Sequence, residues 1–292
     1  MSLTAIDSPW LAAHPLPSVA GGKDKDARGR VLAIGGSAEV PGALLLTGDA
    51  ALRSGAGKVA LATISSIATA IGIAFPEAAV IALAEHDGEI VSPLPDSMQR
   101  RFGQIDALVV GPGMRQTDRT EAIVAALIDQ CEVPILLDAG AMTAAAALLP
   151  GRREVVLTPH PGELARLLDC DKDAIEVDLA AAAHRAADRF GAIVALKSAD
   201  TVIAAPGDSD CLHYRSGVAG LGTAGSGDVL AGLIGGLLAR GAPPREAAAW
   251  GVWLHGEAGR RAGNLCAPIG FRAGEIAVHI PPALHAMETR GG

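Results

Sequence analysis

Short, continuous apolar runs alternate with longer amphipathic stretches along most of the chain. The runs predict strands buried on both faces, because they are too short for helices and end at glycine, proline or a polar residue. They cover residues 31–34, 58–62, 79–83, 107–110, 134–137, 155–157 and 193–196. The stretches that predict helices cover residues 42–53, 120–130, 163–168, 173–189, 229–239 and 245–262, with a short one near 273–277. This alternation predicts an α/β fold with a mostly parallel central sheet covered by helices on both faces.

The two ends of this pattern are less regular. Residues 201–205 and 211–214 predict a hairpin. Residues 1–29 contain proline, glycine and charged residues, and they predict an extended lead-in, with regular structure only from Val31 onward. Because no low-complexity linker or internal repeat divides the remainder, we expect residues 30–292 to form a single catalytic domain.

Polar and glycine residues follow several of the predicted strands. They are residues 35–37, 111–113 and 158–160, together with Asp138 and Lys197. The carboxyl ends of parallel strands meet at one edge of a sheet, which is where ligands bind in such folds. We therefore expect these residues to open on one crevice.

The strongest chemical signal is the glycine-rich segment 220–228, which comes directly before the predicted helix 229–239. Glycines let the backbone approach a ligand, and the first amides of a helix have no partners within the helix. Together with the helix dipole they form a site suited to phosphate. Asp228 at this point is either a simple helix cap or a general base beside the anion site. The segment has no GxxxxGK[ST] pattern, so it is not a Walker-type phosphate loop.

Composition and charge exclude several classes of partner. The chain has 292 residues, of which 50% are hydrophobic, and a formal net charge of −8 without any basic run. Nucleic acid and anionic membrane surfaces are therefore not expected as partners. The cysteines form no CxxC pair, no protein metal cage is visible, and the N-terminus has no signal-peptide pattern. These features predict a cytoplasmic protein with reduced cysteines.

The glycine-rich segment also carries a family resemblance. Residues 224–228, Ala-Gly-Ser-Gly-Asp, resemble the GxGD signature of the ribokinase-like superfamily. Within that superfamily, residues 25–277 resemble the ADP-dependent NAD(P)H-hydrate dehydratases. The matching pieces follow the family order and are residues 29–37, 41–43, 50–57, 75–77, 111–114, 136–139, 157–163 and 196–201. The epimerase domain that some relatives carry before this region is absent from the sequence.

This resemblance implies both a fold and a reaction. It implies a ribokinase-like α/β fold and the nucleotide-dependent dehydration of the S epimer of the 6-hydrate of NADH or NADPH. The reaction would restore NAD(P)H and release phosphate and AMP from ADP, as a repair of nicotinamide nucleotides. ADP or ATP would be the co-substrate, with Mg²⁺ carried by the nucleotide. Relatives suggest a homo-oligomer.

The resemblance also implies roles for individual residues. Asp228 would be the catalytic base and would contact the substrate, as would Ala43, Gly113 and His160. The nucleotide would be bound by Lys197, Ser198, Ala199, Asp200, Thr201, Gly225, Ser226 and Gly227. From the sequence alone, His160 could instead be a strand-end histidine bonded to backbone, and Lys197 a solvated lysine. Glu163 is favoured as a carboxylate in the first turn of a helix.

Three positions depart from the family pattern and leave other functions open. Gly140 stands where relatives carry a second aspartate, Ser198 where glycine is usual, and Val218 near a usual asparagine. One alternative is a small-molecule kinase of the same superfamily that phosphorylates a thiazole or pyrimidine alcohol. The other is a nucleotide-sensing module without catalysis. Residues 35–43 and 158–163 favour the dehydratase over the kinase, and the intact segment 225–228 argues against a decayed site.

Overall fold

One large sheet forms the centre of the molecule. The computed structural model describes residues 2–18, 24–147 and 154–288. Its strands are β1 (Ser2–Ala5), β2 (Arg30–Ile34), β3 (Lys58–Ile64), β4 (Ala79–Leu83), β7 (Ala107–Val110), β8 (Ile135–Leu137), β9 (Val155–Leu157), β10 (Ile193–Leu196), β11 (Asp200–Ala204) and β12 (Asp210–Arg215). They are ordered β1-β12-β11-β10-β9-β8-β7-β2-β3-β4, and only β11 runs antiparallel to its neighbours. The predicted mostly parallel sheet and the hairpin 201–214 are thus confirmed.

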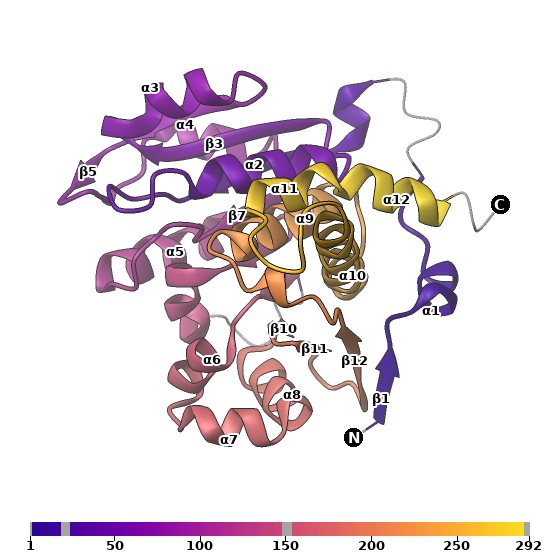
Figure 1. Ribbon diagram of the computed structural model, residues 1–292. Coiled ribbons are helices and arrows are strands. Elements are labelled where there is room, and N and C mark those ends of the chain that lie inside the picture. The colour runs from indigo at the N-terminus through magenta and orange to yellow at the C-terminus, as the bar shows by residue number, and fades with distance from the viewer. Residues whose placement is uncertain (1, 19–23, 148–153, 289–292) are drawn as a thin grey trace.

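Helices cover both faces of this sheet (Figure 1). They are α1 (Ser8–Ala13), α2 (Ala43–Arg53), α3 (Ser65–Ala74), α4 (Asp96–Phe102), α5 (Asp118–Gln130), α6 (Pro161–Leu168), α7 (Lys172–Val177), α8 (Leu179–Phe190), α9 (Ser226–Ala239), α10 (Pro244–Leu265), α11 (Ala273–Val278) and α12 (Ile280–Glu288). Alternate residues of β2 enter different cores: Val31 and Ala33 pack with α2, α9 and α10, whereas Leu32 and Ile34 pack with α5 and α8. The continuous apolar strands of the sequence therefore reflect burial on both faces.

The predicted elements are present, but two boundaries were wrong and some helices were missed. Regular structure begins before Val31, since β1 pairs in parallel with β12 at the edge of the sheet and α1 follows it. The predicted helix 173–189 is two helices, α7 and α8. They separate at Asp178, which adopts a non-helical backbone and caps Ala181 N with its side chain. Helices α3, α4 and α12 were not predicted.

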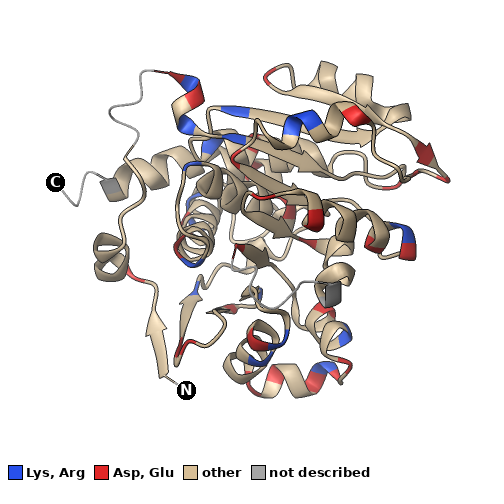
Figure 2. Cartoon of the chain, turned by 180° about the vertical axis from the view of Figure 1, so that it is seen from behind, with Lys and Arg blue, Asp and Glu red and all other residues tan. Residues whose placement is uncertain are grey.

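Charged residues lie mainly outside the sheet. Figure 2 shows basic and acidic segments interspersed over helices and loops, while the central strands are mostly uncharged. Among the helices of the described ranges, none combines the length and the hydrophobicity that a bilayer span requires.

Helix α9 lies unusually close to its neighbours on one face of the sheet. A Cβ atom at Gly232 would lie 2.0 Å from the backbone oxygen of Thr47 in α2, and one at Gly236 would lie 2.0 Å from Ser54 Oγ. Other residues of α9, among them Leu233 and Leu237, are fully buried in the core. The absence of side chains at these two positions is what allows α2 and α9 to pack backbone against backbone.

Gly232→Ala is therefore expected to lower the free energy of unfolding by about 1–3 kcal/mol, as overpacking does. Helix propensity alone would raise it by up to about 1 kcal/mol, so the sign separates the two effects. Gly103→Ala is the matched control, because a Cβ there meets nothing within 4 Å. Urea unfolding of both variants measures the difference, and a Gly232→Ala protein as stable as the control would contradict this packing.

Candidate functional site

The amino end of α9 lies where the glycine-rich segment predicted an anion site. Gly225 is the residue before the helix and adopts φ +86°, a left-handed conformation that glycine adopts without strain. This turn aims the first amides of α9 at the carboxyl edge of the sheet, and the helix carries no side-chain cap there. The Ser226 amide donates to Thr223 O (3.2 Å), which leaves the amides of Gly225 and Gly227 for a phosphate group.

Asp228 lies in the first turn of α9, on the side that faces α2. Its Oδ2 is 3.9 Å from the position that a Cβ of Gly225 would occupy, a position also close to Leu46. Its backbone oxygen accepts a hydrogen bond from Thr47 Oγ1 (3.2 Å). Burial, and then the negative charge of Asp138, raise the pKa of Asp228 to about 6, although Lys197 lowers it. A carboxylate with such a pKa can take up and release a proton near neutral pH.

Asp138 and Lys197 form a paired charge next to the anion site. Asp138 follows β8 and is 3% exposed, and its Oδ1 accepts hydrogen bonds from Thr158 Oγ1 (2.7 Å) and from Lys197 Nζ (2.8 Å). Burial alone would lower the pKa of Lys197, but the charges of Asp138, Glu163 and Asp228 together raise it. A Cβ at Gly227 would lie 3.6 Å from Lys197 Nζ, so the ammonium group faces the anion site.

His160 and Glu163 begin α6 beside this pair. His160 Nδ1 accepts from the amides of Gly162 (3.1 Å) and Glu163 (3.2 Å), and Glu163 Oε2 accepts from the His160 amide (2.8 Å). The prediction of Glu163 as a first-turn helix carboxylate is confirmed. His160 is also bonded to backbone, as its alternative interpretation held, but this leaves the proton on Nε2 of the neutral ring. That nitrogen belongs to a side chain that is 53% exposed.

Ala43 and Gly113 lie together at another part of the same sheet edge. A Cβ at Gly113, where φ is +71°, would lie 2.8 Å from Ala43 Cβ and 3.1 Å from Gly36 Cα. Ala43 is one helical turn before Thr47, whose hydroxyl contacts both the Ala43 and the Asp228 carbonyl oxygens. The predicted substrate residues thus fall in two places, with Ala43 and Gly113 on the α2 side and His160 on the Lys197 side.

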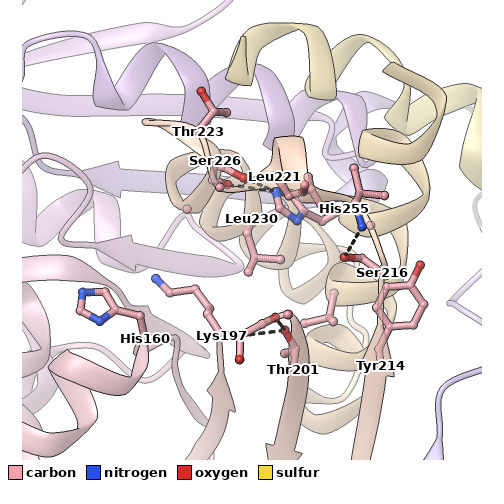
Figure 3. A pocket seen from close by; sticks show the side chains of 18 residues that line it. His160, Lys197, Thr201, Tyr214, Ser216, Leu221, Thr223, Ser226, Leu230 and His255 are labelled. Carbon is pink, nitrogen blue, oxygen red and sulfur yellow. Dashed lines mark hydrogen bonds between the residues drawn. The ribbon is translucent and has the colours of Figure 1, made fainter. Parts of the chain in front are cut away.

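A cavity of about 590 Å³ extends from Lys197 along α9 and α10, a volume usual for small-molecule sites. Its walls include most of the residues predicted to bind nucleotide: Lys197, Ser198, Ala199, Thr201, Ser226 and Gly227, with His160 at one end. Figure 3 shows His160 and Lys197 at one end of the cavity and Tyr214 and Ser216 at the other. Apolar side chains also line it, including Val218, Leu221 and Val252.

Asp200 and Gly225 are not among the residues that line this cavity. The carboxylate of Asp200 pairs with Arg215 (3.1 Å) and lies 3.4 Å from His213 Nδ1. The turn that precedes Asp200 is held by Thr201 rather than by Asp200. Thr201 Oγ1 donates to Ser198 O (3.0 Å) and accepts from Ser198 N (3.3 Å). The nucleotide role of Asp200 therefore stays a prediction.

His255 is a cavity residue that the sequence did not indicate. It lies inside α10, and burial lowers its pKa to about 4. Its Nε2 is 3.0 Å from Ser226 Oγ and 3.1 Å from Ser226 O (Figure 3). A separation of 29 residues between Ser226 and His255 gives no local pattern from which this contact could be predicted.

The departures from the family pattern have structural counterparts. A Cβ at Gly140 would lie 2.4 Å from the backbone oxygen of Arg115 and 2.6 Å from that of Met114, so this position has no room for a carboxylate. Ser198 and Val218 both line the cavity. In the ranges that the structure describes, no three His, Cys, Asp or Glu side chains gather closely enough to hold a metal ion.

Known proteins match this chain over nearly its whole length. The family described as NAD(P)H-hydrate dehydratase matches residues 31–282. An ADP-dependent (S)-NAD(P)H-hydrate dehydratase of Xanthomonas campestris is 46% identical over 95% of this chain and 94% of its own. A bifunctional NAD(P)H-hydrate repair enzyme of Moorella thermoacetica is 36% identical over 97% of this chain, which spans 54% of that relative.

Solved structures agree with the fold. An ADP/ATP-dependent NAD(P)H-hydrate dehydratase of Bacillus subtilis, co-crystallised with ATP and Mg²⁺, has a TM-score of 0.84 and 29% identity, covering 98% of this chain and 99% of that one. A hydroxyethylthiazole kinase of Pyrococcus horikoshii has a TM-score of 0.59 and 17% identity over 90% of this chain and 89% of its own. The kinase likeness shows the ribokinase-like fold alone.

The buried charge of Asp228 has a consequence for stability. Its folded-state pKa of about 6 exceeds the ordinary value of 3.8, so its contribution to stability is present below 3.8 and is lost as pH rises through 6. Asp228→Asn should therefore raise the free energy of unfolding by about 3 kcal/mol near pH 8, with a gain that shrinks as pH falls toward 4. Urea unfolding at several pH values measures this.

Asp129→Asn, at an exposed position of α5, provides the control and should change stability by less than about 0.5 kcal/mol at every pH. An Asp228→Asn protein whose stability follows the wild type across this range would contradict the buried, raised-pKa carboxylate.

Proposed function

This chain belongs to the NAD(P)H-hydrate dehydratase family, whose reaction is the nucleotide-dependent repair of hydrated NAD(P)H, and we propose how its own residues carry out that reaction. The observation that supports the proposal best is the position of Asp228. It stands in the first turn of α9, beside the open amides of the anion site and across from Lys197. A base, an anion site and a cation then surround one point, which is the arrangement that phosphoryl transfer requires.

The first half of the reaction activates a poor leaving group. Asp228 takes the proton of the ring hydroxyl while that oxygen attacks the terminal phosphoryl group of the nucleotide. A new O–P bond forms, and the bridging P–O bond breaks, with AMP leaving when the nucleotide is ADP. The raised pKa of Asp228 suits this transfer, because a base with a pKa near the working pH both accepts and returns the proton.

Charge that develops on the transferring group is stabilised from two sides. The amides of Gly225 and Gly227 face it at the end of α9, where the Ser226 amide already donates to Thr223 O (3.2 Å), and the Lys197 ammonium faces it from the end of β10. Asp138 holds Lys197 in place through a 2.8 Å hydrogen bond. These donors are fixed before the reaction, so they need no reorganisation during it.

The second half expels phosphate from the ring. The C–O bond breaks with its electron pair on phosphate, the ring nitrogen supplies the compensating pair, and the adjacent carbon loses a proton to solvent to restore the double bond. We propose that the ring lies near Ala43 and Gly113, whose small side chains keep the start of α2 and the loop after β7 in close contact. His160 stands at the Lys197 end, where its Nε2–H can donate to the departing phosphate.

Mg²⁺ would fit beside the nucleotide. Asp138 Oδ2 lies 3.9 Å from where a Cβ of Gly227 would stand, and Asp228 Oδ2 lies 3.9 Å from where a Cβ of Gly225 would stand. Mg²⁺ prefers one or two carboxylates together with substrate phosphates. When bound, the ion would neutralise charge on the nucleotide phosphates. We propose that these two carboxylates hold it.

The proposal also covers the choice of nucleotide and substrate epimer, the cellular compartment and the oligomeric state. By likeness to the Xanthomonas relative, we propose ADP as the co-substrate, with ATP as a substitute, and the S epimer of the hydrate as the substrate. We also propose a cytoplasmic homo-oligomer. The four cysteines form no disulfides, which is consistent with a reducing compartment.

Asp228→Asn should reduce turnover of hydrated NADH by roughly 10²- to 10⁴-fold, as loss of a general base does. The assay follows the return of dihydronicotinamide absorbance in the presence of ADP or ATP. Asp129→Asn is again the control and should keep full turnover. Near-normal turnover by a folded Asp228→Asn protein would refute the role of this carboxylate.

ADP should raise the melting temperature of the wild-type protein, because a ligand that binds only the native state stabilises it. Lys197→Met should shrink that shift, since it removes the ammonium that faces the anion site. Lys172→Met, at an exposed position of α7, should leave the shift unchanged. If neither ADP nor ATP at millimolar concentration moved the wild-type transition, the proposed nucleotide site would be wrong.

A further inference from the structure

We propose that His255 is a positioning residue that presets the Ser226 hydroxyl as a hydrogen-bond donor to a nucleotide phosphate. The proposal rests on the nucleotide site proposed above and adds to it a residue that the reaction scheme does not use. His255 comes from the middle of α10, whereas Ser226 opens α9, so the contact joins the anion site to a second helix.

The two contacts of one ring nitrogen determine where the proton lies. His255 Nε2 is 3.1 Å from the carbonyl oxygen of Ser226 and 3.0 Å from its hydroxyl oxygen. A carbonyl oxygen can only accept a hydrogen bond, so a lone pair on Nε2 would face another lone pair. The ring therefore carries its proton on Nε2 and its lone pair on Nδ1.

This tautomer fixes the role of the Ser226 hydroxyl. The Nε2–H group donates to the hydroxyl oxygen as well as to the carbonyl, which makes that oxygen an acceptor toward His255. Its own hydrogen is then free to point elsewhere, and among the described residues the structure gives the hydroxyl no other hydrogen-bond partner. Ser226 lines the nucleotide cavity, where phosphate oxygens accept but do not donate. With the proton on Nδ1 instead, the Ser226 hydroxyl would donate its hydrogen to His255 Nε2 and could not donate it to a phosphate.

The surroundings keep His255 in this neutral state. Burial lowers its pKa to about 4, the nearby charge of Lys197 lowers it further, and only the bond to Ser226 O acts in the other direction. The ring is thus uncharged near neutral pH. His255 therefore orients the Ser226 hydroxyl and adds no charge to the site. Lys197 already supplies the cation that faces it.

A purely structural histidine, which only ties α10 to α9, would give different results from a positioning one. Gln places an amide N–H near the position of Nε2, whereas Met has similar length and no donor. His255→Met should weaken ADP binding roughly five-fold, about the worth of one hydrogen bond, and His255→Gln should stay near the wild type. Ser226→Ala should lose the same factor, and the double variant His255→Met/Ser226→Ala should lose no more than either single one.

Isothermal titration with ADP measures these affinities, and kinetics with hydrated NADH should show the loss in KM for ADP rather than in kcat. Equal losses for His255→Gln and His255→Met, or losses that multiply in the double variant, would overturn the proposal. Failure of the wild type to turn over hydrated NADH would instead count against the proposed function, because ADP binding is measured separately.

The tautomer itself can be read without any variant. Nitrogen-15 NMR of histidine-labelled wild-type protein distinguishes a ring protonated on Nε2 from one protonated on Nδ1. The proposal requires the Nε2–H form for the buried, non-titrating histidine, which His255→Gln assigns by removing its signal. An Nδ1–H form, or a charged ring near neutral pH, would overturn it.

Discussion

Helix α9 packs closely against its neighbours because its buried face carries glycines where their atoms would clash with a Cβ. This packing places its amino end at the carboxyl edge of the sheet. The α2 backbone meets it at Gly232, and Val109 of the central strand β7 meets it at Gly235, where a Cβ would lie 2.3 Å from that side chain. A helix held this closely cannot tilt or slide without clashes. Its amino end, with the amides of the anion site and Asp228, is therefore fixed relative to Asp138, Thr158 and Lys197 at the ends of neighbouring strands.

The charges at that edge divide into a pair and a single carboxylate. Asp138 is bound to Lys197 and to the Thr158 hydroxyl, so its negative charge is compensated. Asp228 lies in the same region without such a direct partner in the described residues, and burial together with the charge of Asp138 raises its pKa. One carboxylate thus positions a cation and the other is left able to exchange a proton. The sheet topology brings these residues together from β8, β9, β10 and α9.

Much of this could be predicted from sequence because it depends on local patterns. Continuous apolar runs ended by glycine or polar residues predicted the parallel strands, and the glycine-rich segment before an apolar helix predicted the left-handed turn at Gly225 that begins α9, with Asp228 in its first turn. The contacts that could not be predicted join distant segments. The Asp138–Lys197 pair spans 59 residues and the Ser226–His255 contact spans 29. The fit of Gly140 against the Arg115 backbone likewise depends on tertiary packing alone, as does the pairing of the short β1 with β12.

The central claim is that the hydroxyl of the hydrate leaves as part of a phosphate, after transfer from the nucleotide. It is tested most directly with hydrated NADH that carries ¹⁸O in its ring hydroxyl, incubated with the enzyme and ADP. Mass spectrometry of the released phosphate should find the label there, in an amount equal to the NADH and AMP formed. Label in water with unlabelled phosphate would contradict the account, because dehydration and nucleotide cleavage would then not share a phosphorylated intermediate.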